Sequence, residues 1–479
     1  MQTGEADHSV ETLGASKGDL HPTDRKWWIL IAVGMGTFMA ALDGSVVNTI
    51  LPVVSRSFHS DVATIEWVVV VYLLVLSGLL LSFGRLGDLH GHRSVYIIGF
   101  SFFLLSSALC SLAPSIAWLI GFRALQAVGG AMLSANSPAI LTKSFPSNQR
   151  GQALGMQATM TYLGLTVGPA LGGWLAEKFG WRSVFYINLP VAATAIWISL
   201  RFIPKEKPQK VIESFDPLGA GLFIVGLTAL LLGLNRGYYL GWGSPLILSL
   251  IALALILLGA FIFVERRVRY PVLDLSLFYH SRVFTGATAS AVLNYICVYS
   301  IIFLMPFYLI TGLNLETSRA GLIMSTQPII MAIVAPISGT VSDRTGTRWP
   351  SVFGMLGLAL GLFLLSRLDA ATPLPQVAVA MGVVGFGTGI FISPNNSALM
   401  GAAPHHRQGI AAGILATARN TGMVLGVGIS GAVFTTVLAH QGLNSSNTLF
   451  TAIHFSFLIS ILFAAFGALT SAIRVEQPK

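Results

Sequence analysis

Hydrophobic residues lie in fourteen long runs along this chain, and short polar segments separate the runs. A helix needs ~20 residues to cross the ~30 Å hydrocarbon core of a bilayer, and each run is near that length or longer. The pattern therefore predicts fourteen transmembrane helices, of which the longest should tilt or bend. The predicted spans are 27–52, 62–83, 94–112, 115–141, 150–175, 183–203, 215–234, 245–264, 282–311, 318–341, 350–366, 376–399, 408–438 and 449–471.

The composition points the same way. Charged residues make up only 10% of the 479-residue chain and hydrophobic residues make up 54%, whereas ordinary soluble domains carry about 25% charged residues. The mean hydropathy is +0.75. These values exclude a soluble enzyme and an intrinsically disordered protein, because such a chain can neither cover a globule with charge nor stay unfolded in water.

The lysines and arginines predict the orientation. If the amino terminus is cytoplasmic, twenty of the 28 basic residues fall in cytoplasmic segments and six in external ones. This bias follows the positive-inside rule, so we expect both termini in the cytoplasm and an even number of spans. The formal charge of +9 therefore reports topology and not nucleic-acid binding. The six external residues are Arg56, Lys178, Arg182, Arg236, Arg319 and Arg367.

An internal repeat relates the first six spans to the last six. The loop after span 2 and the loop after span 10 match at an offset of 255 residues, and spans 5 and 13 match at 258. Two parallel repeats with a site between them suit alternating access by rocking. The matched pairs include Gly84 and Gly339, Asp88 and Asp343, Gly91 and Gly346, Arg93 and Arg348, Gly164 and Gly422, Gly168 and Gly426, and Asn136 and Asn395.

The repeat makes spans 7 and 8 an insertion, which we expect at the periphery of the two halves. We see no secretory signal before the first span. The predicted organisation is a flexible cytoplasmic tail (1–26), an N-terminal six-helix bundle (27–203), a linker with two inserted helices (204–281), a C-terminal six-helix bundle (282–471) and a cytoplasmic tail (472–479).

Four segments carry motifs. Residues 84–93 follow G-x-L-x-D-x-x-G-x-R, residues 123–129 follow R-x-x-Q-x-x-G, residues 155–173 are glycine-rich around Pro169, and residues 42–52 read LDGSVVNTILP. Together they resemble the major facilitator superfamily, and within it the drug:proton antiporters with fourteen spans. The resemblance implies an all-α polytopic membrane protein with the major facilitator fold.

The resemblance further implies multidrug efflux by proton-coupled antiport, in a bacterial inner membrane and as a monomer. The sequence shows no nucleotide-binding or catalytic motif, so we expect a proton gradient as the energy source, with no enzyme activity, cofactor or metal. Cys110 and Cys297 lie singly in apolar runs, where a packing role is favoured. The expected partners are hydrophobic or amphipathic small molecules, protons and the lipid bilayer.

Three ionisable residues are candidates for proton coupling. Asp43 lies 16 residues after Trp27, beyond the midplane toward the outside, where a carboxylate must be paired, hydrated or protonated. Arg123 in span 4 keeps its charge and is the expected partner of such a carboxylate. Glu66, near the outer end of span 2, is either an exit-side proton site or an interfacial residue of the aromatic belt.

Polar, aromatic and thioether side chains inside the spans are candidates for the substrate cavity. Rings and thioethers form an adaptable apolar wall, although helix packing explains any single one of them equally well. Span 13 carries Arg419 and no acid, so Arg419 is either a helix-pinning residue or a selector of anionic or zwitterionic cargo. The candidates are Met39, Gln126, Asn136, Asn294, Tyr295, Tyr299, Phe303, Asn395 and Arg419.

A third group is expected to act in gating. Glycines spaced by four on one side of span 5 allow a neighbouring backbone to approach, and the proline there bends the helix. The charged turns after spans 2 and 10 suit weak latches that open in each cycle. The candidates are Gly84, Asp88, Gly91, Arg93, Gly164, Gly168, Pro169, Gly172 and Asp343.

Two other functions stay open on the sequence. One is a dedicated exporter of a single endogenous lipid or metabolite, which the missing acid of span 13 leaves possible. The other is a membrane sensor or scaffold that transports nothing, for which Asp43 would be dispensable.

Overall fold

The computed structural model describes residues 22–146, 149–205, 217–268, 275–404, 407–441 and 446–473, and within these ranges every regular element is a helix. Most of the predicted tails, and parts of the predicted linker at 206–216 and 269–274, lie outside the described residues. Thirteen of the described helical segments are long and apolar enough to cross a membrane. They coincide with thirteen of the fourteen predicted spans, and the remaining span is α6 (Arg150–Phe179), which is 30 residues long but interrupted by glycines and hydroxyl residues.

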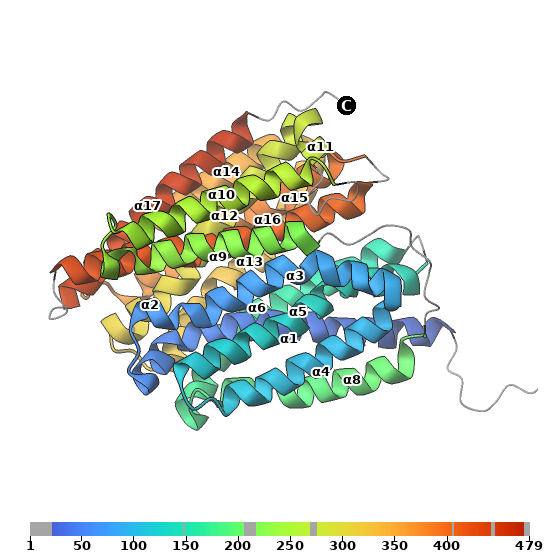
Figure 1. Ribbon diagram of the computed structural model, residues 1–479, viewed down its shortest axis with the longest axis horizontal. Helices are drawn as coiled ribbons and strands as arrows, with labels where there is room; N and C mark the ends of the chain where they lie inside the picture. Colours follow the sequence, from blue (N-terminus) through green and yellow to red (C-terminus); the bar gives the residue numbers. More distant parts are fainter. Residues whose placement is uncertain are drawn as a thin grey trace, which may run out of the picture.

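The N-terminal half forms one bundle, drawn in blue to green in Figure 1. Its second and sixth spans are each divided in two where they enter the bundle, at Glu66 and Ile187, although both residues keep helical φ angles of −58° and −62°. Its helices are α1 (Pro22–Phe58), α2 (Val62–Ile65), α3 (Trp67–His90), α4 (His92–Ser111), α5 (Ile116–Ser144), α6, α7 (Ser183–Tyr186) and α8 (Asn188–Phe202).

The C-terminal half forms the second bundle, drawn in yellow to red in Figure 1. Its first span ends in a π-helical turn after Pro306, where the proline ring lacks the N–H that would continue the α-helical pattern. Its elements are α12 (Arg282–Pro306), η2 (Phe307–Gly312), α13 (Thr317–Thr345), α14 (Arg348–Ser366), α15 (Leu374–Gly401), α16 (Gln408–Gln441) and α17 (Ser446–Ala472); the short α11 (Leu275–His280) precedes them.

The repeat is visible in the packing of equivalent helices. A Cβ placed on Gly164 of α6 would lie 2.6 Å from the Phe38 carbonyl of α1, and one on Gly422 of α16 would lie 2.5 Å from the Val292 carbonyl of α12. In both halves, therefore, small residues let the first and fifth spans approach backbone to backbone. The prediction of two six-helix parallel repeats is confirmed.

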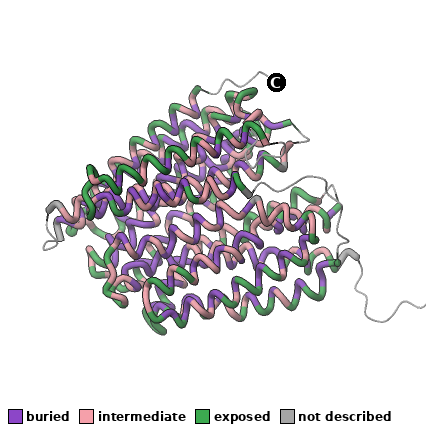
Figure 2. The backbone as a smooth tube through the Cα atoms, in the orientation of Figure 1, coloured by how far each residue is buried: buried purple, intermediate pink, exposed green. Residues whose placement is uncertain are grey.

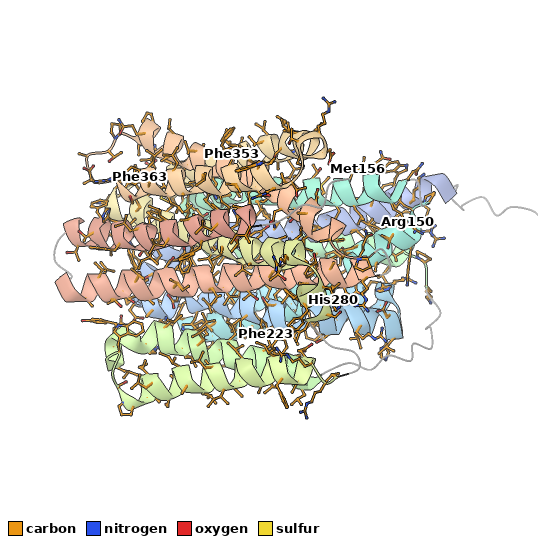
Figure 3. All side chains as sticks on the ribbon, turned by 90° about the horizontal axis from the view of Figure 1, so that it is seen from above. Arg150, Met156, Phe223, His280, Phe353 and Phe363 are labelled. Atoms are coloured by element: carbon orange, nitrogen blue, oxygen red, sulfur yellow. The ribbon has the colours of Figure 1, made fainter. Side chains whose placement is uncertain are left out.

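The inserted pair consists of α9 (Pro217–Leu240) and α10 (Pro245–Glu265), and it lies at one edge of the molecule, where Phe223 is labelled in Figure 3. The most apolar window of α10 is only 17% buried, so this helix faces lipid. Helix α9 packs against α10 on one side and against both α3 and α16 on the other. The pair is therefore peripheral, but α9 crosses the seam between the two halves.

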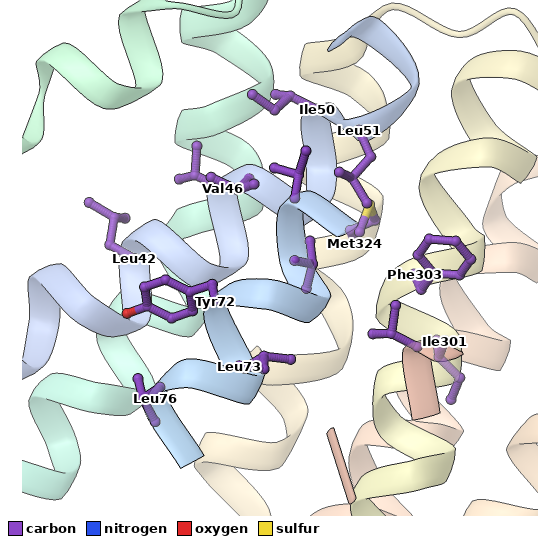
Figure 4. Close-up of a cluster of buried hydrophobic side chains, with 14 of the residues drawn as sticks. Leu42, Val46, Ile50, Leu51, Tyr72, Leu73, Leu76, Ile301, Phe303 and Met324 are labelled. Atoms are coloured by element: carbon purple, nitrogen blue, oxygen red, sulfur yellow. The ribbon is translucent and has the colours of Figure 1, made fainter. Parts of the chain in front are cut away.

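Buried residues line the inner faces of the helices, while exposed positions lie outside (Figure 2). One continuous apolar cluster includes side chains of both halves. Figure 4 shows part of it, with Leu42 and Leu73 from the N-terminal half on one side and Ile301 and Phe303 from α12 on the other. The two halves thus share a hydrophobic contact, which stabilises this arrangement of the bundles.

Candidate functional site

A buried ion pair lies inside the N-terminal half. Nη1 of Arg123 in α5 is 2.5 Å from Oδ2 of Asp43 in α1, and the two residues are 1% and 2% exposed. Arg123 lies only seven residues after the start of α5, at the end of α5 that is farthest from the first residues of α1. The ion pair therefore lies in the half of the bundle away from the start of α1. The sequence named both residues, and the structure brings them into direct contact.

Two amides complete the environment of the carboxylate. Nε2 of Gln126 and Nδ2 of Asn188 each donate to Oδ1 of Asp43 at 3.0 Å. Asp43 therefore accepts hydrogen bonds from both α5 and α8, which offsets part of the cost of burying its charge. Sequence reasoning missed Asn188, and the available signal was an amide inside an otherwise apolar run next to Pro190.

Arg123 has further partners that do not depend on Asp43. Its Nε donates to the Val68 carbonyl at 3.1 Å, its Nη1 donates to Oε1 of Gln126 at 2.6 Å, and its Cζ lies 4.2 Å from the centre of the Tyr72 ring. These contacts keep the guanidinium partly satisfied when the carboxylate is neutral. Arg123 is thus held by α3 and by Gln126 as well as by Asp43.

Glu66 is also buried, so it is not an interfacial residue at the membrane surface as one interpretation of the sequence held. It is 1% exposed and accepts a hydrogen bond from Nδ2 of Asn235 in α9. Asn235 was not predicted, and it joins the inserted pair to the N-terminal half.

A second polar group is half-buried and contains residues from both halves. Tyr295 and Tyr299 of α12 lie close to Arg419 of α16, and Arg419 is within hydrogen-bonding reach of the Tyr295 hydroxyl. Tyr162 of α6, from the opposite half, lies in electrostatic range of the same arginine. Nε of Arg419 is buried without a hydrogen-bond partner. The cluster therefore presents a positive charge within an aromatic wall that both halves build.

The charge of Arg419 has no acid to balance it inside its own half. Between 282 and 471 the chain has only three acids, Glu316, Asp343 and Asp369. Glu316 and Asp369 lie between helices, and Asp343 lies in the last turn of α13. A guanidinium cannot release its proton, so it needs water, dipoles or a bound anion.

Other residues expected in the cavity lie elsewhere in this conformation. Gln126 belongs to the ion pair, and five candidates are fully buried in helix contacts within the described core. Asn136 donates to the Phe83 carbonyl at 3.0 Å and Asn395 to the Ala287 carbonyl at 3.1 Å, whereas Asn294 donates to the Met355 sulfur at 3.5 Å. The five are Met39, Asn136, Asn294, Phe303 and Asn395.

The charged turn after α3 ties helices of one half together. Asp88 lies 3.3 Å from Nε2 of His92, and Arg93 donates to the Leu200 carbonyl of α8 at 2.7 Å. Gly91 has a φ of +88°, which only glycine adopts without strain. In these contacts the turn acts as a clamp within the N-terminal half.

The second copy of the turn has the same backbone form. Gly346 has a φ of +85°, and Gly84 and Gly339 each pack on the fourth span of their own half, against Ala135 and Ser393. Asp343 is exposed. The repeat thus preserves the shape of the turn more closely than its charge contacts.

Helix α6 packs its glycine face on α1. A Cβ on Gly168 would lie 1.9 Å from Ser45 Oγ, and one on Gly172 would lie 2.7 Å from a methyl of Val46. Pro169 has no N–H to donate to the Leu165 carbonyl, which instead accepts from Ser45 Oγ at 3.4 Å. The proline and the glycines therefore shape one close interface between α1 and α6.

The same helix also meets the other half. A Cβ on Gly173 would lie 2.2 Å from the Thr317 carbonyl of α13, and one on Gly321 would lie 2.1 Å from the Pro169 carbonyl. We call the end of the bundle that carries residues 59–61, 180–182 and 313–316 the distal end. The contacts of α6 with α13 lie toward this end.

Polar contacts reinforce the closure of the distal end. Arg56 of α1 donates to the Ile310 carbonyl of η2 at 3.0 Å, and Oε2 of Glu177 accepts from the Ser318 N–H at 3.2 Å. The two halves are therefore joined at the distal end in this structure. Within the described ranges, no three His, Cys, Asp or Glu side chains come together as metal ligands would.

Comparisons with known proteins agree with this architecture. The chain matches the Major Facilitator Superfamily over residues 33–427 and 287–479. A crystal structure of a bacterial homologue of the human lysosomal transporter Spinster, in an inward-facing and unoccupied conformation, superposes with a TM-score of 0.67. That match covers 94% of this chain and 97% of the other at 13% identity, so it bears on the fold alone.

Two curated relatives are more similar in sequence. The chain is 35% identical over 428 residues to the riboflavin transporter RibZ of Clostridioides difficile (strain 630), covering 88% of this chain and 91% of RibZ. It is 34% identical over 405 residues to the multidrug resistance protein Stp of Mycobacterium tuberculosis (strain CDC 1551 / Oshkosh), covering 84% of this chain and 75% of Stp.

Proposed function

Because this chain belongs to the major facilitator superfamily, and is thus a multi-pass secondary transporter and not an enzyme, we propose that it exports hydrophobic or amphipathic small molecules in exchange for protons. The observation that carries the proposal is the buried Asp43–Arg123 pair, a titratable carboxylate held inside the membrane by partners that tolerate its neutral form. The likeness to a multidrug resistance protein supports a broad cargo range.

The direction of transport rests on the orientation of the bundle. The excess of lysine and arginine near the chain termini favours a cytoplasmic location for that end of the bundle. The distal end then faces outside, and its closure corresponds to a state that takes cargo from the cytoplasm. Asp43 takes up a proton when the distal end opens and releases it to the cytoplasm, while cargo moves the other way by rocking of the two halves. We place the protein in a bacterial inner membrane, working as a monomer.

Flux in liposomes tests this function. Purified protein should accumulate a lipophilic dye against its gradient when the vesicle lumen is made acidic, with the cytoplasmic end facing the bath. A protonophore should abolish the accumulation, and adding dye should release protons that a pH-sensitive fluorophore records. Dye accumulation that is unchanged by the protonophore would exclude proton coupling. The absence of flux for every compound would favour the sensor or scaffold function.

A second candidate function is export of one endogenous metabolite, and the cluster of Arg419 with its tyrosines favours it. A fixed cation inside an aromatic wall suits a planar molecule that carries an anionic or carbonyl-rich edge. The similarity to a riboflavin transporter is in keeping with such a cargo.

Arg419→Gln separates the two functions. The substitution removes the only fixed charge of the cluster, so transport of aromatic carboxylates or riboflavin should fall about tenfold, as expected for ~1.4 kcal/mol of lost binding. Export of lipophilic cations should be unchanged or improved. Uptake assays with both cargo classes measure this, and an equal loss for both classes would identify Arg419 as a structural residue.

A further inference from the structure

The Glu66 carboxyl group occupies a point where three parts of the molecule meet. It belongs to the junction of α2 and α3, its Oε1 accepts from Asn235 of the inserted helix α9, and a Cβ on Gly431 of α16 would lie 1.7 Å from its Oε2. Nδ2 of Asn235 also donates to the Ala63 carbonyl at 2.7 Å. The N-terminal half, the inserted pair and the C-terminal half therefore all touch this one side chain.

The site is polar on one side only. Oε2 of Glu66 is buried without a hydrogen-bond partner, and it faces the glycine of α16. None of the ion pairs found in the described part of the chain involves Glu66. Burying an unpaired carboxylate costs far more free energy than burying the neutral acid. This closed arrangement consequently suits a carboxylic acid, with its O–H at Oε2.

The elements packed against Glu66 bring charges of both signs near it. Asp61 lies just before α2, the exposed Arg236 and Tyr239 come from α9, and α16 presents glycine at the contact. Partial burial alone would raise the pKa of Asp61, but hydrogen bonds from Thr64 and Tyr239 lower it overall. Asp61 thus stays negative, which opposes a second negative charge on Glu66, whereas Arg236 acts in the other direction.

Helix α9 is built to stay with the N-terminal half when the other half moves. It holds α2 and α3 through the two hydrogen bonds of Asn235, and Ile224 fits against Gly78 of α3. Its contact with α16 is apolar, with Leu231 seated on Gly428. Gly428 and Gly431 are three residues apart and so share one face of α16. That smooth face can leave α9 and Glu66 without breaking a hydrogen bond.

We propose that Glu66 is a second proton site with a gating role, which holds its proton while α16 covers it, releases it to external water when the distal end opens, and takes one back from the same water before that end closes, so that only Asp43 carries a proton to the cytoplasm. The Oε2–H bond breaks, its electron pair remains on the carboxylate, and the proton passes to water. The inserted pair is then a working part of the transporter, since Asn235 keeps the carboxyl group aimed at α16. This inference rests on the proposed function only in requiring that protons drive the cycle.

Distance measurements between spin labels at the distal end test the inference without any transported cargo. Lys178→Cys on α6 and Arg319→Cys on α13 place labels on exposed positions of opposite halves, and the two native cysteines are buried. Protonation should favour the closed state, so raising the pH from about 5 to about 8 should increase the open population of the parent protein about threefold or more. No change with pH in the parent protein would overturn the proposal.

Two variants locate the effect at Glu66. Glu66→Gln imitates the neutral acid and should keep the distal end closed at every pH, whereas Gly431→Ala should force α16 off the carboxyl group and favour the open state. Gly259→Ala of α10, where a Cβ meets nothing within 4 Å, is the matched control for the glycine change. Asp43→Asn should keep the pH response, which separates this site from the ion pair. A pH response that survives in Glu66→Gln would refute the assignment.

Discussion

Asp43→Asn is expected to abolish export driven by a proton gradient, with a loss of at least about tenfold in the accumulation ratio. An asparagine can still accept from Gln126 and Asn188, but it can neither take up nor release a proton. Downhill movement of cargo through the same pathway should continue, because the substitution does not touch the tyrosine cluster. Gradient-driven uptake and downhill counterflow, measured in the same liposomes, give the two readings.

The same substitution should also destabilise the protein. It leaves Arg123 buried without its carboxylate, and breaking one side of a buried pair typically costs about 3–5 kcal/mol. The contacts of Arg123 with Val68, Gln126 and Tyr72 should reduce that cost. Thermal unfolding of the detergent-solubilised protein measures the change.

The double variant Asp43→Asn, Arg123→Gln is the matched control. It removes both charges together, so the melting temperature should recover while gradient-driven export stays absent. This result would separate coupling from folding. Full export by either variant, with the pH dependence of the parent protein, would show that Asp43 is a structural residue.

Gly173→Ala is expected to reduce transport about tenfold while leaving the N-terminal half correctly folded. The three nearest atoms to a Cβ at this position all belong to α13 of the other half, with the Thr317 carbonyl at 2.2 Å. Backbone atoms cannot change conformation as easily as a flexible side chain can. The added methyl group should therefore hold the distal ends of the two halves apart. The transporter would then lose its state closed at the distal end.

Gly155→Ala on the same helix is the control for this change. No atom lies within 4 Å of a Cβ at Gly155, and the gain in helix propensity is the same. Initial transport rates and accessibility of a distal cysteine to a membrane-impermeant reagent should distinguish the two variants. Equal rates in both would mean that the α6–α13 contact does not control the cycle.

The internal repeat predicted where the inserted helices lie but not which residues they contact. The offset between matched residues predicted that spans 7 and 8 are additional to a six-plus-six core, and their position at the edge of the bundle agrees with that prediction. The offset carried no information on Asn235, because a residue outside the repeat has no partner to be compared with. Its bond to Glu66 joins positions 169 residues apart, and helix packing alone creates that contact.

The sequence by itself determined the number and order of the spans, since each crossing of a bilayer demands about 20 mainly apolar residues. It also determined the doubling of the fold, because registered glycines and charged turns recur along the chain. Asp43 and Arg123 could be named as candidates for one physical reason. A charged residue inside an apolar run is costly to bury, so it can be recognised in the sequence without knowledge of its neighbours in the fold.

Only the tertiary structure decided which polar residues meet. In lipid every face of a helix is apolar, so hydrophobicity does not reveal which face contacts which neighbour. Asn188 therefore joined Asp43, Asn235 joined Glu66, and Tyr162 approached Arg419 through packing that no local pattern encodes. For the same reason, three amides inside spans serve helix contacts in this fold, namely Asn136, Asn294 and Asn395. Burial and partner geometry, and not polarity, decide whether an amide faces a cavity.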